Sequence, residues 1–182
     1  MKKIALSLIF ILSACATPSQ DARIEIYPSV APSSIGNGIS LSITVDDARS
    51  TGVIGSTGEN SQIITSQDLA ELIGLALVDA YSKQGFTVSA ADNPNAVKML
   101  VSLEDLSYSK DGNLVTTTVE TKSRVKVDVS DKGFIRTYSN SEDRTMPFSA
   151  NEASNNSQLR SILERMVERI VKDAELLGAL VK

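Results

Sequence analysis

The sequence of 182 residues contains no histidine, no tryptophan and a single cysteine, Cys15. Histidine is the commonest acid–base group and metal ligand in proteins, so its absence excludes many catalytic arrangements and most metal sites. One cysteine cannot form a disulfide bond within the chain. We therefore expect no cofactor, no bound metal and a domain that is stabilised by packing alone.

Long apolar runs are also missing. The run near the N-terminus, Ile4 to Leu12, covers nine residues, whereas a membrane-spanning helix needs roughly 20. It follows Lys2 and Lys3 and precedes small residues, which is typical of a secretory signal peptide. The sequence therefore predicts export rather than a permanent transmembrane helix.

Leu12, Ser13, Ala14 and Cys15 resemble the lipobox of bacterial lipoproteins. The resemblance implies cleavage before Cys15, which then carries a diacylglycerol and an N-acyl chain such as palmitate. Two or three acyl chains anchor a protein almost permanently. A chance thiol after an ordinary signal peptide is the alternative. Ala16, rather than aspartate, follows the cysteine, which by resemblance to the sorting rule of enteric-type bacteria implies the outer membrane rather than the inner one.

The sequence also lacks an excess of positive charge. Cleavage removes Lys2 and Lys3 and leaves 16 basic against 22 acidic residues, a formal charge of −6. A chain with this charge repels polyanions, so we expect no nucleic-acid partner. The remaining 168 residues suit one domain. We predict a signal peptide over residues 1–14, a lipidated cysteine with a flexible tether over 15–22, and one periplasmic domain over 23–182.

The N-terminal half of this domain shows both the two-residue hydrophobic period of strands and the longer period of a helix. Arg23 to Tyr27 is a first short strand, and Ile39 to Val45 alternates apolar and polar residues as a half-buried strand requires. The glycine-rich stretch Asp46 to Asn60 is expected to be a loop, and Gln62 to Thr65 a brief strand. A helical period follows from Ser66 to Gln84, with Thr65 and Asp68 spaced like a capping box and Gly85 as its end.

The C-terminal half begins with strands at 86–89 and 97–103, separated by a turn at 93–95. The apolar parity then slips before Leu106, which predicts a β-bulge near Glu104 and Asp105. Asp111-Gly112 is a hairpin turn signal. It leads into the long alternating strand Leu114 to Ser130, in which Val115, Val119, Val125, Val127 and Val129 are expected to face inward.

A strand from Phe134 to Phe148, a polar loop from Ser149 to Asn156 and a final amphipathic helix complete the chain. On this helix Arg169 and Asp173 are spaced for an i,i+4 ion pair. The predicted order is β-β-α-β-β-β-β-α. We expect an α+β fold whose antiparallel-rich mixed sheet carries two amphipathic helices on one face.

Several segments are similar to the YajG family of Gram-negative lipoproteins. They are the lipobox, Ile24 to Pro28, Gly38 to Val45 with Asp47 to Arg49 after it, Ile64 to Leu69, and Gln84 to Phe86. These motifs are strand, cap and turn signatures. The resemblance implies an envelope lipoprotein and carries no active-site residue across.

Two kinds of site remain for consideration. The acidic neighbours Asp46-Asp47, Glu104-Asp105 and Glu142-Asp143 could supply the two carboxyls of a glycosidase only if separate segments brought them together, because adjacent strand residues point to opposite faces. Solvated turns are the more ordinary interpretation. The candidate binding face consists of Glu120, Lys122, Arg124 and Lys126 on the solvated side of the long strand, although mixed charges are common on any exposed sheet.

The sequence therefore favours a non-catalytic binding or assembly module, attached to the membrane through Cys15 and contacting an envelope protein or a glycan. Two alternatives belong to other classes. A carboxylate-based cell-wall enzyme would show two acidic side chains facing each other in a partly buried cleft. A lipid-binding accessory of an envelope transporter would show an apolar cavity that opens to solvent.

Overall fold

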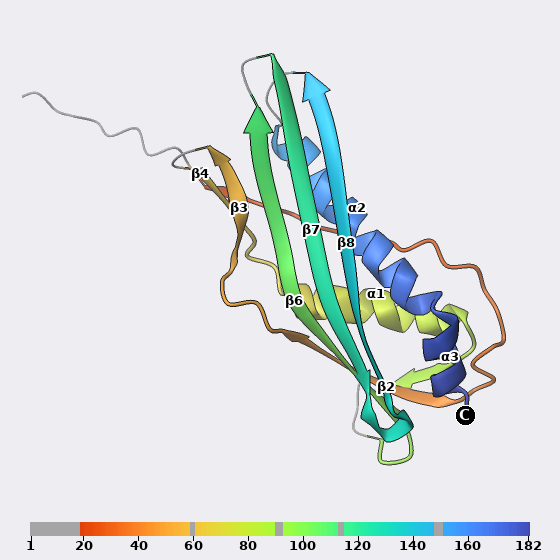
Figure 1. Cartoon of the computed structure of the whole chain (residues 1–182). Helices are drawn as coiled ribbons and strands as arrows, with labels where there is room; N and C mark the ends of the chain where they lie inside the picture. Colours follow the sequence, from red (N-terminus) through yellow and green to blue (C-terminus); the bar gives the residue numbers. More distant parts are fainter. Residues whose placement is uncertain (1–18, 59–60, 90–92, 113–114, 148–150) are drawn as a thin grey trace, which may run out of the picture.

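The computed structural model describes residues 19–58, 61–89, 93–112, 115–147 and 151–182. A single sheet carries the helices on one side, and its three longest strands lie in front of α1 and α2 in Figure 1. The elements in chain order are β1 (Gln20–Asp21), β2 (Ser40–Asp47), β3 (Val53–Gly58), β4 (Ser61–Ile64), α1 (Leu69–Lys83), β5 (Thr87–Ser89), β6 (Val97–Gly112), β7 (Thr116–Val129), a 3-10 turn (Ser130–Lys132), β8 (Phe134–Pro147), α2 (Glu152–Val171) and α3 (Ala174–Leu180). The α+β class is confirmed.

The predicted antiparallel-rich sheet is wrong. The pairs β1–β4, β2–β5, β2–β6 and β3–β6 are parallel, while only β3–β4, β6–β7 and β7–β8 are antiparallel. Helix α1 connects the early strands to the parallel strand β5, as a crossover between parallel neighbours requires. Residue alternation within a strand is the same for both pairings, so the sequence pattern does not reveal strand direction.

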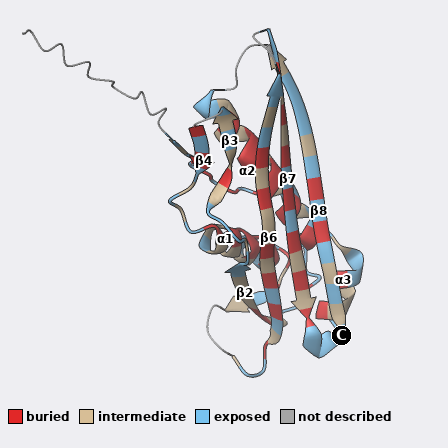
Figure 2. Ribbon diagram, turned by 60° about the vertical axis from the view of Figure 1, so that its left-hand side comes forward, coloured by how far each residue is buried: buried red, intermediate tan, exposed pale blue. Residues whose placement is uncertain are grey.

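The long strands β6, β7 and β8 form the part of the fold that the sequence describes best. Their buried and exposed residues alternate as stripes in Figure 2, and Val119, Val125, Val127 and Val129 are fully buried as predicted. The pairing of β6 with β7 shifts register between Leu103 and Asp105, which confirms the β-bulge.

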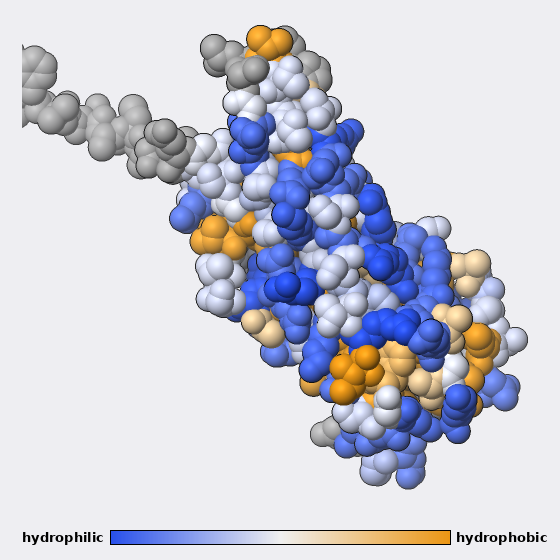
Figure 3. All heavy atoms as spheres, in the orientation of Figure 1, coloured by the Kyte–Doolittle hydropathy of each residue, from blue (hydrophilic) through white to orange (hydrophobic). Residues whose placement is uncertain are grey.

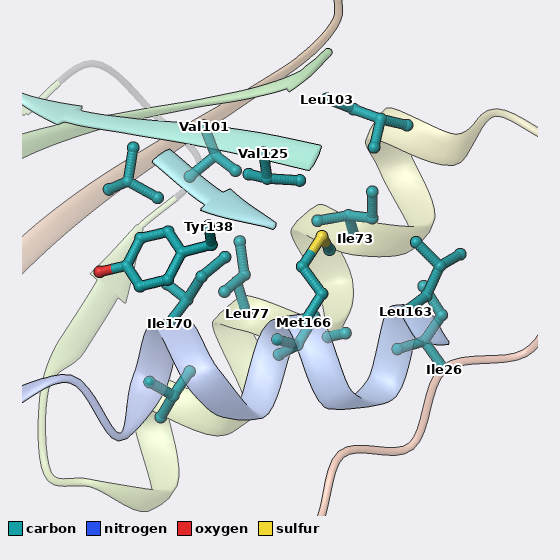
Figure 4. Packing of buried hydrophobic residues seen from close by; sticks show 14 of the residues in the cluster. Ile26, Ile73, Leu77, Val101, Leu103, Val125, Tyr138, Leu163, Met166 and Ile170 are labelled. Atoms are coloured by element: carbon teal, nitrogen blue, oxygen red, sulfur yellow. The ribbon is translucent and has the colours of Figure 1, made fainter. Parts of the chain in front are cut away.

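The hydrophobic core lies between this sheet and the two long helices. Figure 4 shows Ile73 and Leu77 of α1 and Met166 of α2 packed beneath Val101 and Val125 of the sheet, and all five are buried. Helix α1 ends at Lys83, followed by the C-cap Gln84 and by the predicted stop Gly85, which has a left-handed φ of 83°. Its start differs, because Asp68 is the N-cap and accepts from the Glu71 amide, so the Thr65–Asp68 capping box is wrong.

The segment predicted as the first strand, Arg23 to Tyr27, lies outside the sheet. Its backbone bonds to side chains instead, because Gln67 both accepts from the Ile24 amide, at 2.6 Å, and donates to the Ile24 carbonyl, at 3.1 Å. Ala22 and Ile24 are fully buried, and Gln20–Asp21 pairs with β4. Residues 20–22 of the tether predicted over residues 15–22 are therefore held by the domain, and residues 15–18 lie outside the described part.

Three further local predictions are corrected. The expected loop from Asp46 to Asn60 contains β3, whose Gly55 lies beside Tyr108 of β6. Asp111 and Gly112 are the last paired residues of β6 rather than the turn itself. Val115 precedes β7 and is 71% exposed instead of facing inward.

The final helix is divided in two. Helix α2 begins at Glu152, inside the expected polar loop, and ends at Val171, after which Asp173 caps α3. Asp173 binds Arg136 of β8, so the predicted pair of Arg169 with Asp173 is wrong. The buried Tyr138 on the same strand also donates a hydrogen bond to Asp173, whereas exposed i,i+4 pairs contribute little.

Candidate functional site

The outer surface of β7 carries the four residues singled out from the sequence. Glu120, Lys122 and Arg124 expose 38%, 50% and 54% of their side chains, and Lys126 is partly exposed. They share one side of the strand, because the intervening residues face the helices and are buried. We name the set Glu120, Lys122, Arg124 and Lys126 the charged face.

Ion pairs hold part of the charged face in place. Lys122 Nζ lies 2.8 Å from Glu120, and Arg124 Nε lies 3.3 Å from Glu104 on β6. The hydrogen bond with Glu120 raises the pKa of Lys122. Lys126 lies between Ser102 and Thr137 in the ladder and forms no ion pair with a described residue. This lysine is therefore available to an anionic partner.

A shallow hollow of about 260 Å³ lies within this face. In the ladder Lys122 is paired with Ser141 and Arg124 with Ser139, so small hydroxyl side chains on β8 lie beside long cations on β7. Asp105 completes the lining from β6, next to the bulge. Two cations, two hydroxyls and one carboxylate suit a ligand that carries anionic or hydroxyl groups.

Two polar atoms beneath this hollow have no hydrogen-bond partner in the described part of the chain. They are Ser123 Oγ and Asn140 Nδ2, which belong to paired residues of β7 and β8. Buried polar groups are normally hydrogen-bonded, so these two atoms leave hydrogen-bonding capacity unused between β7 and β8.

Two apolar residues that the sequence pattern did not single out lie on the same outer surface. Leu100 and Ile135 are 43% and 61% exposed and occupy one row of the ladder on either side of Asp128. In Figure 3 this surface is largely blue, with an orange area toward its lower end. Both residues stand at outward positions of strands in which buried and exposed residues alternate. This position was the sequence signal that could have identified them.

One residue of each acidic pair is held in an ion pair with an arginine. Asp47 is bound to Arg49 at 2.7 Å, Glu104 to Arg124, and Glu142 to Arg165 at 3.0 Å. Hydrogen bonds from Arg49 lower the pKa of Asp47. A lowered pKa favours the ionised carboxylate, whereas a general acid needs a raised pKa, so Asp47 is suited to its ion pair with Arg49 rather than to proton donation.

The residues that carry the anchor prediction, Leu12, Ser13, Ala14 and Cys15, lie outside the described residues. Within the residues that the structure describes, no helix is both long and apolar enough to cross a membrane. The same residues contain no group of three or more cysteine, aspartate or glutamate side chains placed to hold a metal ion.

Comparison with solved structures gives distant similarities. A protein described as uncharacterized shares 12% identity with a TM-score of 0.48, covering 82% of this chain and 98% of that chain. A protein described as a homologue of the neuraminyllactose-binding hemagglutinin, from Helicobacter pylori, shares 7% with a TM-score of 0.46, covering 88% and 96%. Rare lipoprotein B from Shewanella oneidensis shares 12% with a TM-score of 0.39, covering 77% and 92%.

These TM-scores are all below 0.5 and carry no argument about function. No curated protein matches the chain. A family model described as "Uncharacterized lipoprotein" matches residues 28–180, which is most of the chain. The chain therefore belongs to this lipoprotein family, the YajG family that its sequence motifs resemble, and is an envelope-associated protein.

Proposed function

We propose that the protein is a non-catalytic binding module of the cell envelope, anchored through lipid on Cys15 and contacting its partner through the charged face. Membership of a lipoprotein family supports the anchor, and the resemblance of residues 12–15 to a lipobox supports Cys15 as the lipidated residue. Ala16 supports the outer membrane as the destination. The domain then faces the periplasm, where its partner is an envelope protein or a glycan.

The charged face carries this proposal. Its inner side is packed against the helices, whereas no described element covers its outer side, where Lys122 and Arg124 are about half exposed. Lys126 has no ion-pair partner among the described residues, and the hollow beside Lys122 and Arg124 offers hydroxyl groups from Ser139 and Ser141. A partner with carboxylate, phosphate or hydroxyl groups would satisfy these donors.

The two alternatives receive less support. An enzyme built on carboxylates needs one raised and one ordinary pKa in opposed roles, and the shifted carboxyls of the described part are all lowered by hydrogen bonds. A lipid-binding accessory needs an apolar cavity, whereas the hollow in the charged face is lined by charged and hydroxyl side chains. No observation on the described residues favours either alternative.

Crosslinked capture tests the proposed function. The variant Lys122→Glu, Arg124→Glu, Lys126→Glu reverses the charge of the face, and the matched control Lys83→Glu, Lys132→Glu, Lys182→Glu makes the same change in net charge at three other exposed sites. Both variants are first compared with the natural protein in thermal melts, because the comparison requires intact folds. We expect the face variant to lose its crosslinked partner and the control to retain it. Identical partners in both variants would overturn the proposal.

A further inference from the structure

The strand β8 forms an open edge of the sheet. Among the described residues it pairs only with β7, along 14 residues. The direction of its free hydrogen-bonding groups follows from two bonds. The Glu142 carbonyl accepts from the side-chain hydroxyl of its ladder partner Thr121 on β7, while the Ser139 carbonyl accepts from the Arg169 side chain of α2, away from β7.

Residues two apart on a strand direct their backbone groups to the same side. The N–H and carbonyl groups of Thr137, Ser139 and Ser141 therefore point away from the sheet, and all three residues are exposed. Arg169 donates to the Ser139 carbonyl at 2.5 Å and also bonds to the Asn140 side chain. An exposed arginine thus occupies the position in which the N–H of a further strand would donate.

The middle of this edge lacks the usual protection against strand pairing. Proteins blunt exposed edges with lysines, prolines or inward-pointing charges. The segment from Thr137 to Ser141, Thr-Tyr-Ser-Asn-Ser, contains no charged residue and no proline, although Arg136 and Glu142 flank it. Five residues of open, uncharged edge are sufficient for a short added strand.

A cationic cleft lies beside the same edge. Figure 1 shows the C-terminal half of α2 running out past β8, and a hollow of about 490 Å³ separates them. It is lined by Thr137 and Tyr138 together with four cationic and two acidic side chains. These are Arg136, Arg165, Arg169, Lys172, Glu168 and Asp173. Both acids are already bound, Glu168 by Lys172 at 2.8 Å and Asp173 by Arg136 at 2.5 Å. From outside the lining, Glu142 pairs with Arg165 at 3.0 Å and Glu175 pairs with Arg136. Arg169 has no carboxylate partner among the described residues.

We propose that the edge of β8 binds an extended acidic peptide segment of another envelope protein, which adds a strand beside Thr137, Ser139 and Ser141. Alternate side chains of the added strand would face the cleft, where Arg169 leaves the Ser139 carbonyl and pairs with a carboxylate. Pairing of two β8 strands is disfavoured, because it would bring the cations of both copies of α2 together. This site is the edge of the sheet and goes beyond the charged face proposed above.

The probe is a synthetic strand of about eight residues, about 27 Å long when extended, with glutamate and threonine in alternation. Binding is measured by fluorescence anisotropy with the full protein purified from membranes in detergent. Two control peptides test the two parts of the proposal. The first replaces glutamate with lysine, and the second is N-methylated at alternate residues so that one edge of its backbone cannot donate. We expect both to bind about tenfold more weakly or worse.

Matched variants test the protein side. Ser139→Pro removes an N–H that points away from β7, so the ladder remains intact, whereas Ser139→Ala retains it. We expect the proline variant to weaken binding about tenfold, the alanine variant to bind normally, and Arg169→Gln to weaken binding of the acidic peptide about tenfold. Lys83→Glu, on α1 and outside the lining of both hollows, should leave binding unchanged. Attraction to the charged face alone would not depend on the backbone of the peptide, so the N-methylated peptide distinguishes failure at the edge from failure of the charged face.

Three results would overturn the inference. Equal binding of the N-methylated peptide would show that charge alone holds it. Normal binding by Ser139→Pro would remove the edge as the site, and if that variant fails to fold, the methylated peptide decides the question. A concentration-dependent dimer that Ser139→Pro abolishes would show that a second copy occupies the edge.

Discussion

The hydroxyl of Tyr138 donates a hydrogen bond to Asp173 Oδ2 over 2.7 Å, which joins the last strand to the junction between α2 and α3. Asp173 also binds Arg136 and accepts from the backbone amides of Glu175 and Leu176 as the N-cap of α3. One carboxylate therefore caps α3, directly after the end of α2, and attaches this junction to the sheet.

Asp173→Ala should destabilise the domain by about 2 to 3 kcal/mol, because it removes a helix cap and leaves the buried Tyr138 hydroxyl without an acceptor. Glu175→Ala is the matched control. Glu175 contacts the same arginine but is 75% exposed, so its loss should change the free energy of unfolding by less than about 0.5 kcal/mol. Urea denaturation of both variants measures the difference, and equal effects would contradict the central position of Asp173.

Acid should remove the contribution of Asp173. Burial opposes ionisation of this carboxyl, but hydrogen bonds from Tyr138, the Leu176 amide and Arg136 outweigh it and hold the pKa below the usual value. Burial raises the pKa of Tyr138, so the phenol remains the donor. Since the folded pKa is lowered, the stabilisation is complete above the unfolded pKa of about 3.9 and is lost as the pH falls through the folded value.

Asp173→Asn is the variant that tests this pH dependence. The gap in unfolding free energy between the natural protein and Asp173→Asn should be widest near neutral pH and close below about pH 4. Denaturation at a series of pH values provides the measurement. A gap that stays constant down to pH 2 would show that the charge of Asp173 does not contribute.

A new aspartate at two adjacent positions of β7 should change the stability of the domain by very different amounts. Val127 is fully buried, so Val127→Asp places an unpaired charge in the core and should cost several kcal/mol, on the order of 3. Lys126→Asp lies on the outer surface and should change stability by no more than about 0.5 kcal/mol. Thermal melts decide, and equal destabilisation would mean that the strand is buried on both sides.

Gly55 permits the close approach of β3 and β6. A Cβ atom at this position would lie 1.9 Å from the Tyr108 carbonyl oxygen, whereas at Gly52 it would meet nothing within 4 Å. We expect Gly55→Ala to separate the strands and cost about 1 to 3 kcal/mol, and Gly52→Ala to be neutral or slightly stabilising, by about 0.4 to 1 kcal/mol. Chemical denaturation measures both, and a neutral Gly55→Ala would show that β3 does not need this contact.

The anchor is tested by mass spectrometry of the membrane fraction. We expect the natural protein to begin at a lipidated Cys15 and Cys15→Ser to lack lipid; an intact Met1 or an unmodified Cys15 would refute the lipobox interpretation. Ala16→Asp should move the protein to the inner membrane in density-gradient fractionation. An unchanged position would contradict the sorting inference while leaving the lipid anchor intact.

Local patterns determined much of this protein. Alternation in β7 identifies Val125 and Val127 as inward and Lys122 as outward, because neighbouring side chains on a strand point to opposite faces whatever the strand pairs with. The parity slip before Leu106 located the bulge for the same reason. The charged face could therefore be read from the sequence, and so could the end of α1 at Gly85, whose positive φ is a local requirement.

Long-range contacts decided the remainder. Pairing direction is not encoded in alternation, so the parallel neighbours of β2 and the contact of Gly55 with Tyr108 appear only when the chain is folded. Asp173 and Arg136 are 37 residues apart, and their bond lies at the break between α2 and α3, through which the helical periodicity of the sequence continues. The cleft beside β8 likewise exists because α2 crosses that edge, a relationship between distant segments that no local period records.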